Sequence, residues 1–132
     1  MGSSITGTPA EMEMAIGGTV LCTPHLVPMT RGILATCYGE TDGEGDPLDC
    51  LRRAYAHEPF VHVSEELPAT KWLAGSNGAQ LTARSDSRTG RVVVLSAIDN
   101  LGKGAAGQMI QCANLMLGDD ETAGLTIIGV YP

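Results

Sequence analysis

Residues 91–118 carry the clearest pattern of apolar and polar positions in the chain. Val92 to Leu95 are apolar at consecutive positions, so we expect a strand that is covered on both faces and lies centrally in a sheet. After a glycine-rich turn, apolar and polar residues recur at the spacing of a helix. The apolar positions are Met109, Ile110, Ala113, Met116 and Leu117, and the polar positions are Gln108, Gln111 and Asn114. The pattern predicts that the apolar face of this helix packs on the core.

Similar patterns divide the rest of the chain into short elements. In residues 31–39 the odd-numbered side chains from Ile33 to Cys37 point one way, and the even-numbered ones from Leu34 to Tyr38 point the other. Asp46 followed by Pro47 is typical of a helix start. The other elements that we expect are a helical turn at 9–16 capped by Thr8, strands at 19–23 and 60–64, a hairpin of residues 79–84 and 91–98, and a strand-like segment at 125–130.

The order of these elements favours an α+β fold. Hairpins, rather than regular strand-helix-strand alternation, indicate a mixed, mostly antiparallel sheet with helices on one face. We expect residues 9–132 to form a single domain and residues 1–8 to be a flexible N-terminus.

The turn after the 91–98 strand reads Gly102-x-Gly104-x-x-Gly107, which matches the dinucleotide-binding fingerprint. A dinucleotide-binding fold needs several further strands, and only residues 119–132 follow the helix, so we reject that interpretation. Two others remain open. Exposed backbone N–H groups beside Lys103 favour a bound anion, with Asn100, Gly104 and Gln108 as further contacts. Alternatively, the glycines only let the helix pack closely on the sheet.

Other candidate site residues lie between residues 22 and 31 or at the end of the 91–98 strand. His25 lies between two prolines in a loop, where it is either a structural side chain or a presented catalytic one, with the Cys22 thiol beside it. Arg31 either forms a surface salt bridge or binds a carboxylate or phosphate through its planar guanidinium. Asp99 and Asn100 either cap the helix or contact a ligand, and capping is favoured.

Composition limits the class of protein. The chain has 43% hydrophobic and 17% charged residues and a net charge of -7, which is typical of a globular protein and argues against nucleic acid or an anionic membrane as a partner. Neither a membrane span nor a signal peptide is evident, so we expect a cytoplasmic protein. Its four cysteines form no Cys-x-x-Cys pair, so we expect buried thiols and no metal site.

Several blocks of sequence together resemble one family. They are residues 97–108, 114–118 and 121–125 near the C-terminus, the block 23–36 that begins Thr-Pro-His-Leu, and two short blocks at 58–61 and 75–77. These blocks, in this order, resemble the C-terminal part of N-acetyl-gamma-glutamyl-phosphate reductases, the NADP-dependent semialdehyde dehydrogenases of arginine biosynthesis. The resemblance implies a domain similar to the C-terminal domain of glyceraldehyde-3-phosphate dehydrogenase, in which the sheet pairs subunits, so we expect a homo-oligomer or a partner subunit.

The resemblance also implies what is missing. Family members begin with a nucleotide-binding domain that ends at a catalytic cysteine, and their base is in a His-x-His-Thr-Pro-Glu-like motif. Here Ile5 and Gly7 precede Thr8 and Pro9, where that motif has histidines. We therefore expect a truncated domain that binds an acidic or phosphorylated metabolite and dimerises, without hydride transfer of its own and without a cofactor unless a separate nucleotide-binding domain supplies NADP.

Two other functions remain open from the sequence. One is a recruited paralogue that acts as a cofactor-independent cyclase, isomerase or lyase in a specialised pathway, using His25, a thiol such as Cys22, and an anion site at Lys103. The other is a purely structural interaction protein.

Overall fold

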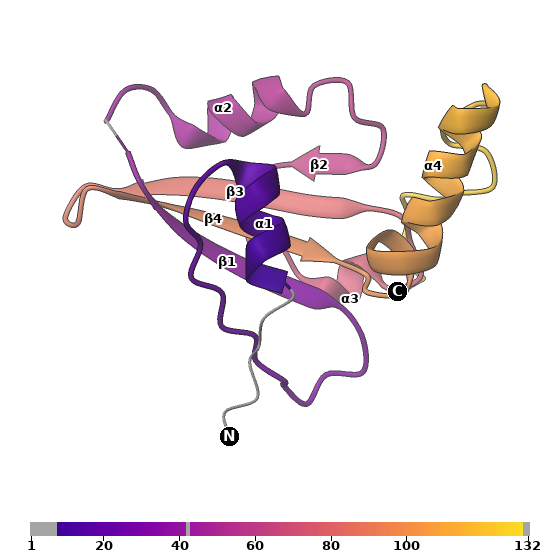
Figure 1. Ribbon diagram of the computed structural model, residues 1–132, viewed down its shortest axis with the longest axis horizontal. Coiled ribbons are helices and arrows are strands. Elements are labelled where there is room, and N and C mark those ends of the chain that lie inside the picture. Colours follow the sequence, from indigo (N-terminus) through magenta and orange to yellow (C-terminus); the bar gives the residue numbers. More distant parts are fainter. Residues whose placement is uncertain (1–7, 42, 131–132) are drawn as a thin grey trace.

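The computed structural model describes residues 8–41 and 43–130, and these residues form a four-stranded sheet with helices around it (Figure 1). The sheet order is β1-β4-β3-β2, with β1 at Ile33–Glu40, β2 at Val61–Val63, β3 at Ala79–Asp86 and β4 at Arg91–Ile98. β4 pairs antiparallel with both β1 and β3, whereas β2 pairs parallel with β3. The expected α+β fold with a mixed, mostly antiparallel sheet is confirmed.

The hairpin of β3 and β4 closes through a turn that Asp86 organises. The Asp86 carboxylate accepts hydrogen bonds from the Arg88 N–H at 3.0 Å and from the Thr89 hydroxyl at 2.9 Å. Gly90 then takes a positive φ of 65°, which glycine adopts without steric cost. Local turn chemistry of this kind is visible in a sequence, and the predicted hairpin is confirmed.

Two helices flank β2 in the chain, one before it and one after it. Helix α2, at Pro47–Ala54, begins where predicted: the Asp46 side chain accepts a hydrogen bond from the Leu48 N–H at 2.9 Å. The second is a short helix, α3 at Thr70–Leu73. It lies in the crossover between the parallel strands β2 and β3.

The core lies on the β3 side of the sheet. Its most buried apolar side chains are Leu48 of α2, Phe60, Leu73, and Ala79, Leu81, Ala83 and Ala97 of the two hairpin strands. At the opposite edge of the sheet, Leu34 of β1 is 51% exposed and Tyr38 of β1 is 69% exposed. Val92 to Leu95 of β4 are only half-buried. β4 is an inner strand of the sheet as predicted, but the prediction that both its faces are covered was wrong, because no element among the described residues covers the β1 half of the sheet.

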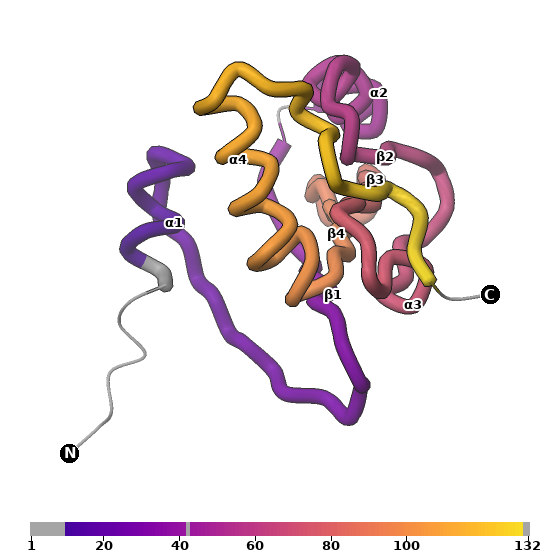
Figure 2. The backbone as a smooth tube through the Cα atoms, turned by 90° about the vertical axis from the view of Figure 1, so that its right-hand side faces the viewer, coloured from indigo at the N-terminus to yellow at the C-terminus, as the bar shows by residue number. Residues whose placement is uncertain are grey.

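The N-terminal part of the described chain stands apart from the sheet (Figure 2). Helix α1 at Thr8–Ile16 confirms the predicted helical turn, and Gly17 ends it with a φ of 75°. The predicted strand at 19–23 is wrong: residues 18–29 form no strand, since no other strand lies beside them to pair with. The expectations for residues 1–7 and for capping by the Thr8 side chain lie outside the described residues.

The C-terminal segment is extended but is not the predicted strand. It is held to the loop before β3 by two backbone hydrogen bonds, from Asn77 N–H to the Thr126 carbonyl at 2.7 Å and from Val130 N–H to the Ala74 carbonyl at 2.8 Å. Two isolated bonds do not make a ladder, so this prediction was wrong. Within the described residues, none of the helices combines the length and apolar character that a membrane span requires.

Candidate functional site

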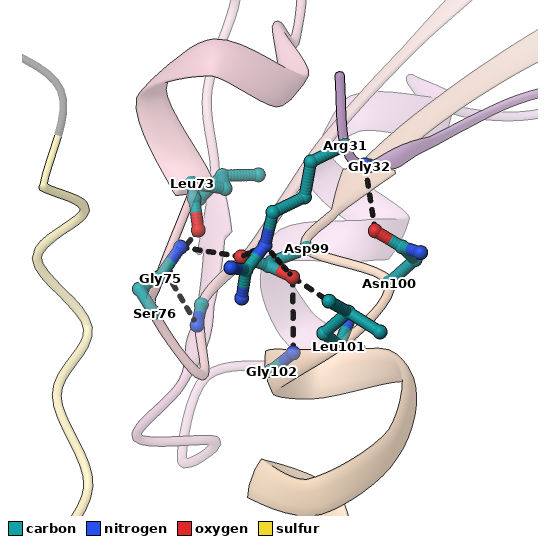
Figure 3. A network of polar contacts seen from close by, with 10 residues as sticks. Arg31, Gly32, Leu73, Gly75, Ser76, Asp99, Asn100, Leu101 and Gly102 are labelled. Atoms are coloured by element: carbon teal, nitrogen blue, oxygen red, sulfur yellow. Dashed lines mark hydrogen bonds and ion pairs between the residues drawn. The ribbon is translucent and has the colours of Figure 1, made fainter. Parts of the chain in front are cut away.

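The carboxylate of Asp99 lies at the centre of a polar network at the end of β4 (Figure 3). Asp99 is fully buried. Its Oδ1 accepts hydrogen bonds from the Leu101 N–H at 2.8 Å and the Gly102 N–H at 3.0 Å, while its Oδ2 accepts one from the Gly75 N–H. Arg31 Nε lies 2.9 Å from Oδ1 and 2.8 Å from Oδ2. One carboxylate thus joins three loops that are far apart in the sequence.

These contacts determine the ionisation of the buried carboxyl. Burial alone would raise the pKa of Asp99, but the hydrogen bonds from Arg31 and from the N–H groups of Gly102, Gly75 and Leu101 outweigh it. They hold the pKa at about 2, below the ordinary value of 3.8. Asp99 is therefore a permanent anion at neutral pH, and the structure gives it the capping role that the sequence favoured.

The outer edge of Arg31 remains available to a ligand. Its side chain is 37% exposed, and only Nε contacts Asp99. Among the described residues, no hydrogen-bond acceptor occupies the two terminal nitrogens of this guanidinium. An arginine held in this way presents two parallel N–H donors to a carboxylate or phosphate at little further entropic cost. The salt bridge that the sequence left as an alternative is present, and it is compatible with anion binding.

The Asn100 side chain binds the backbone of Gly32, the residue after Arg31. Its Oδ1 accepts a hydrogen bond from the Gly32 N–H at 2.8 Å. Gly32 has a φ of 114°, a value that residues with a Cβ rarely adopt. Asn100 therefore fixes the approach to β1 and the position of Arg31.

The glycine turn is built for close packing. It forms a π-helical turn, η1 at Gly102–Ala106, that leads into α4 at Gly107–Leu117. A Cβ on Gly102 would overlap the Ser76 carbonyl oxygen, and one on Gly107 would overlap Asn77 Oδ1. Three N–H groups that could bind an external anion already have acceptors: those of Leu101 and Gly102 donate to the Asp99 carboxylate, and that of Gly104 donates to the Asp99 carbonyl. The packing interpretation therefore explains Gly102 and Gly107, and the anion site at Gly104 stays a prediction.

The other two residues assigned to that anion site point to different places. Lys103 Nζ donates to Gln111 Oε1 at 2.7 Å and lies 5.6 Å from the centre of the Phe60 ring. Burial lowers the pKa of the Lys103 amine, against the opposing effect of nearby acidic groups. Gln108 instead contacts the Cys112 sulfur at 3.5 Å. Lys103 and Gln108 thus have other partners than Arg31 does. Their role as anion contacts stays a prediction.

Helix α4 buries its polar face and exposes its apolar face, the opposite of the sequence prediction. Its buried side chain is the polar Gln111, which is 5% exposed, whereas Met109 is 71% and Met116 86% exposed. Gln111 accepts hydrogen bonds from Asn77 Nδ2 at 2.9 Å and from Lys103, and it donates to Glu121 Oε1 at 2.6 Å. The prediction that the apolar face packs on the core was wrong, because a polar network that includes Asn77, which the sequence did not single out, holds the helix in place.

His25 and Cys22 do not join this network. His25 is exposed, and within the described part of the chain its Nδ1 contacts only the Thr23 carbonyl, at 3.0 Å. Cys22 is half-buried, and Cys37, Cys50 and Cys112 are exposed free thiols, so the expected buried thiols were wrong. No cluster of three or more His, Cys, Asp or Glu side chains suited to a metal ion occurs among the described residues.

A family model described as the semialdehyde dehydrogenase dimerisation domain matches residues 9–100. The chain therefore belongs to the semialdehyde dehydrogenase dimerisation-domain family.

Several similar proteins carry the name N-acetyl-gamma-glutamyl-phosphate reductase. The chain is 52% identical to such a reductase, numbered 1, of Nostoc sp. (strain PCC 7120 / SAG 25.82 / UTEX 2576) over 86% of its own length and 34% of the relative's. It is 47% identical to that of Bradyrhizobium sp. (strain ORS 278) over 97% of the chain and 40% of the relative. The chain thus spans only 34% to 40% of these relatives, and the resemblance found in the sequence is confirmed.

Proposed function

We propose that this chain is the part of an N-acetyl-gamma-glutamyl-phosphate reductase that binds substrate and dimerises, and that it does not transfer hydride by itself. The family match over residues 9–100 is the observation that carries the proposal. The names of the relatives supply the substrate class, an acyl phosphate that also bears a carboxylate. Both groups are anions that an arginine binds well.

Arg31 is the side chain that we assign to the substrate. Asp99 fixes its Nε, and the terminal nitrogens have no hydrogen-bond acceptor among the described residues. Asp99 balances the single positive charge of the guanidinium, but the terminal N–H donors have no acceptor among the described residues, so a second anion gains hydrogen bonds without displacing the first. In a chain of net charge -7, such a cation is a selective place for an anionic ligand.

The purified chain is expected to bind N-acetyl-gamma-glutamyl phosphate without oxidising NADPH. Within the described residues His25 contacts no carboxylate and no thiol, so a nucleophile-base pair is lacking there. Titration calorimetry measures binding, and the absorbance of reduced nicotinamide measures turnover. Arg31→Met is expected to weaken binding at least tenfold, the order that loss of a charge-assisted bidentate contact gives.

Arg88→Met is the matched control for this test, because Arg88 is an exposed arginine in the β3–β4 turn, at the opposite end of β4 from Asp99. The same assay on the complete Nostoc relative shows that the substrate and the coenzyme are competent. Turnover by this chain alone would refute the absence of hydride transfer. Unchanged binding by Arg31→Met, with its fold intact by circular dichroism, would refute the assignment of Arg31.

For dimerisation we propose the sheet face that carries Leu34 and Tyr38. These residues pair with Ala97 and Val93 of β4, so their side chains lie on one face of the sheet. The apolar area left uncovered there is the kind that a symmetric partner buries.

Tyr38→Glu is therefore expected to turn a dimer into a monomer, because it places a charge in the centre of that contact. Analytical ultracentrifugation measures the mass. Leu26→Glu is the control, since Leu26 is fully exposed on the connection that precedes β1. A dimer that survives Tyr38→Glu would place the twofold contact elsewhere.

A further inference from the structure

The C-terminal segment of the described chain, residues 125–130, runs beside the loop that donates a hydrogen bond to Asp99 (Figure 3, pale yellow ribbon). Two backbone hydrogen bonds join the segment to this loop: Asn77 N–H to the Thr126 carbonyl at 2.7 Å, and Val130 N–H to the Ala74 carbonyl at 2.8 Å. Gly75, whose N–H donates to Asp99 Oδ2, lies between the two bonded positions of the loop. The segment therefore holds the loop on both sides of Gly75.

Val130 also contacts Gly75 through its side chain. A Cβ on Gly75 would lie 3.2 Å from both Cγ atoms of Val130, so the two methyl groups lie directly beside the glycine. Valine is stiff at χ1 because two heavy atoms branch from its Cβ, and this contact therefore limits the movement of Gly75. Val130 is 78% exposed and lies outside the core. Its side chain can thus be changed without opening a cavity in the core.

Gly75 binds one particular oxygen of the Asp99 carboxylate. Oδ1 accepts hydrogen bonds from the Leu101 and Gly102 N–H groups of the adjoining turn, whereas Oδ2 accepts one from the Gly75 N–H, 24 positions away. Among the described residues, the only other contact of Oδ2 is with Arg31 Nε, at 2.8 Å. The plane of the carboxylate therefore depends on Gly75. Because Arg31 Nε contacts both oxygens, that plane also determines the direction of the guanidinium.

We propose that Val130 is a positioning residue for Arg31. Val130 keeps Gly75 in place, the Gly75 N–H fixes the Asp99 carboxylate, and the carboxylate directs the terminal nitrogens of Arg31 toward a ligand. The proposal rests on the proposed function, because it concerns the same ligand, N-acetyl-gamma-glutamyl phosphate. Val130 acts through Gly75 and Asp99, not by contact with that ligand.

The first test is titration calorimetry of the full chain with N-acetyl-gamma-glutamyl phosphate. Val130→Gly removes both methyl groups and keeps the backbone N–H. It is expected to weaken binding about fivefold, the order that one hydrogen bond contributes. Val130→Ile keeps both branches at Cβ and is expected to bind as the wild type does.

Ile128→Gly is the matched control for loosening of the segment. Ile128 is 75% exposed, and its N–H donates to Thr126 Oγ1 within the same segment. The change gives the segment a glycine but leaves the contact between Val130 and Gly75 in place. Binding by Ile128→Gly is therefore expected to equal that of the wild type.

The second test is hydrogen exchange of single backbone amides, measured by NMR, because a general loss of stability would not affect one amide selectively. In Val130→Gly, the Gly75 N–H is expected to exchange at least tenfold faster than in the wild type. The Leu101 N–H, which donates to the other oxygen of Asp99, is expected to keep its rate. In Val130→Ile and Ile128→Gly, both amides are expected to exchange as in the wild type.

The proposal is overturned if Val130→Gly leaves binding or the exchange of Gly75 unchanged, or if Ile128→Gly weakens binding equally. If Arg31→Met weakens binding and Val130→Gly does not, this proposal fails and the proposed function stands. If the wild-type chain does not bind the acyl phosphate, both fail.

Discussion

Asp99→Asn is expected to lower the free energy of unfolding by about 3 kcal/mol at pH 7. The amide has the size of the carboxylate but no charge for Arg31, and its NH₂ group must face one of the N–H donors that now point at Asp99. Removing the charge alone costs about 2 kcal/mol, because the pKa of about 2 lies nearly two units below its ordinary value. The unfavourable contact between donors adds the remainder.

The same carboxylate gives the protein a defined acid sensitivity. Because the pKa of Asp99 is lower in the folded state, its contribution to stability is fully present above pH 4 and is lost as the pH falls through about 2. Urea unfolding between pH 2 and pH 7 therefore gives a smaller loss of stability in Asp99→Asn than in the wild type.

Asp120→Asn is the matched control for both measurements. Asp120 also accepts hydrogen bonds, from the N–H and the hydroxyl of Thr122, but it is exposed. It is expected to unfold almost as the wild type does. If Asp99→Asn had the same free energy of unfolding at pH 7 as the wild type, the buried network would contribute nothing to the stability of the fold.

Gly107→Ala is expected to destabilise the protein by about 2 kcal/mol, although alanine ordinarily favours a helix over glycine. Its Cβ would overlap Asn77 Oδ1 and lie 3.0 Å from the Gly102 carbonyl carbon. Asn77 is 2% exposed and is held by its hydrogen bond to Gln111, so moving it away would break that hydrogen bond. Thermal unfolding measures the change.

Gly104→Ala provides the comparison within the same turn. Its nearest contacts would be the Asp99 carbonyl oxygen at 3.3 Å and Ile98 Cδ1 at 3.4 Å, which small shifts accommodate, so the change is expected to stay below about 1 kcal/mol. In an Asn77→Ala background, Gly107→Ala is expected to cost less than it does alone, because the overlapping atom is gone. If Gly107→Ala lowered the stability equally in the wild type and in Asn77→Ala, Asn77 would not be the reason for a glycine at position 107.

Elements defined by local chemistry could be predicted from the sequence. The Asp46 cap, the Asp86 turn and the alternation of β1 each depend on residues within a few positions of one another. The 19–23 segment also has strand-forming residues, but a strand exists only where a partner lies beside it. The pairing of segments that are distant in the sequence cannot be predicted from the residues of either segment alone.

The orientation of α4 could not be predicted for a related reason. A helical pattern separates a polar face from an apolar one, but it does not say which face the same chain covers. Gln111 is buried because Asn77, 34 residues away, donates to it. For Arg31 and Asp99, the sequence named both residues and left their roles open, and the contact that joins them spans 68 positions.

That span has a consequence for the order in which the chain can fold during synthesis. β1 is made early, yet its ladder partner is β4, and the carboxylate that anchors its start is Asp99. Until the ribosome has released the β3–β4 hairpin, the backbone N–H and C=O groups of β1 have no ladder partner. Chains that terminate before Asp99 are therefore expected to engage chaperones or aggregate, whereas those that extend beyond it can close the sheet.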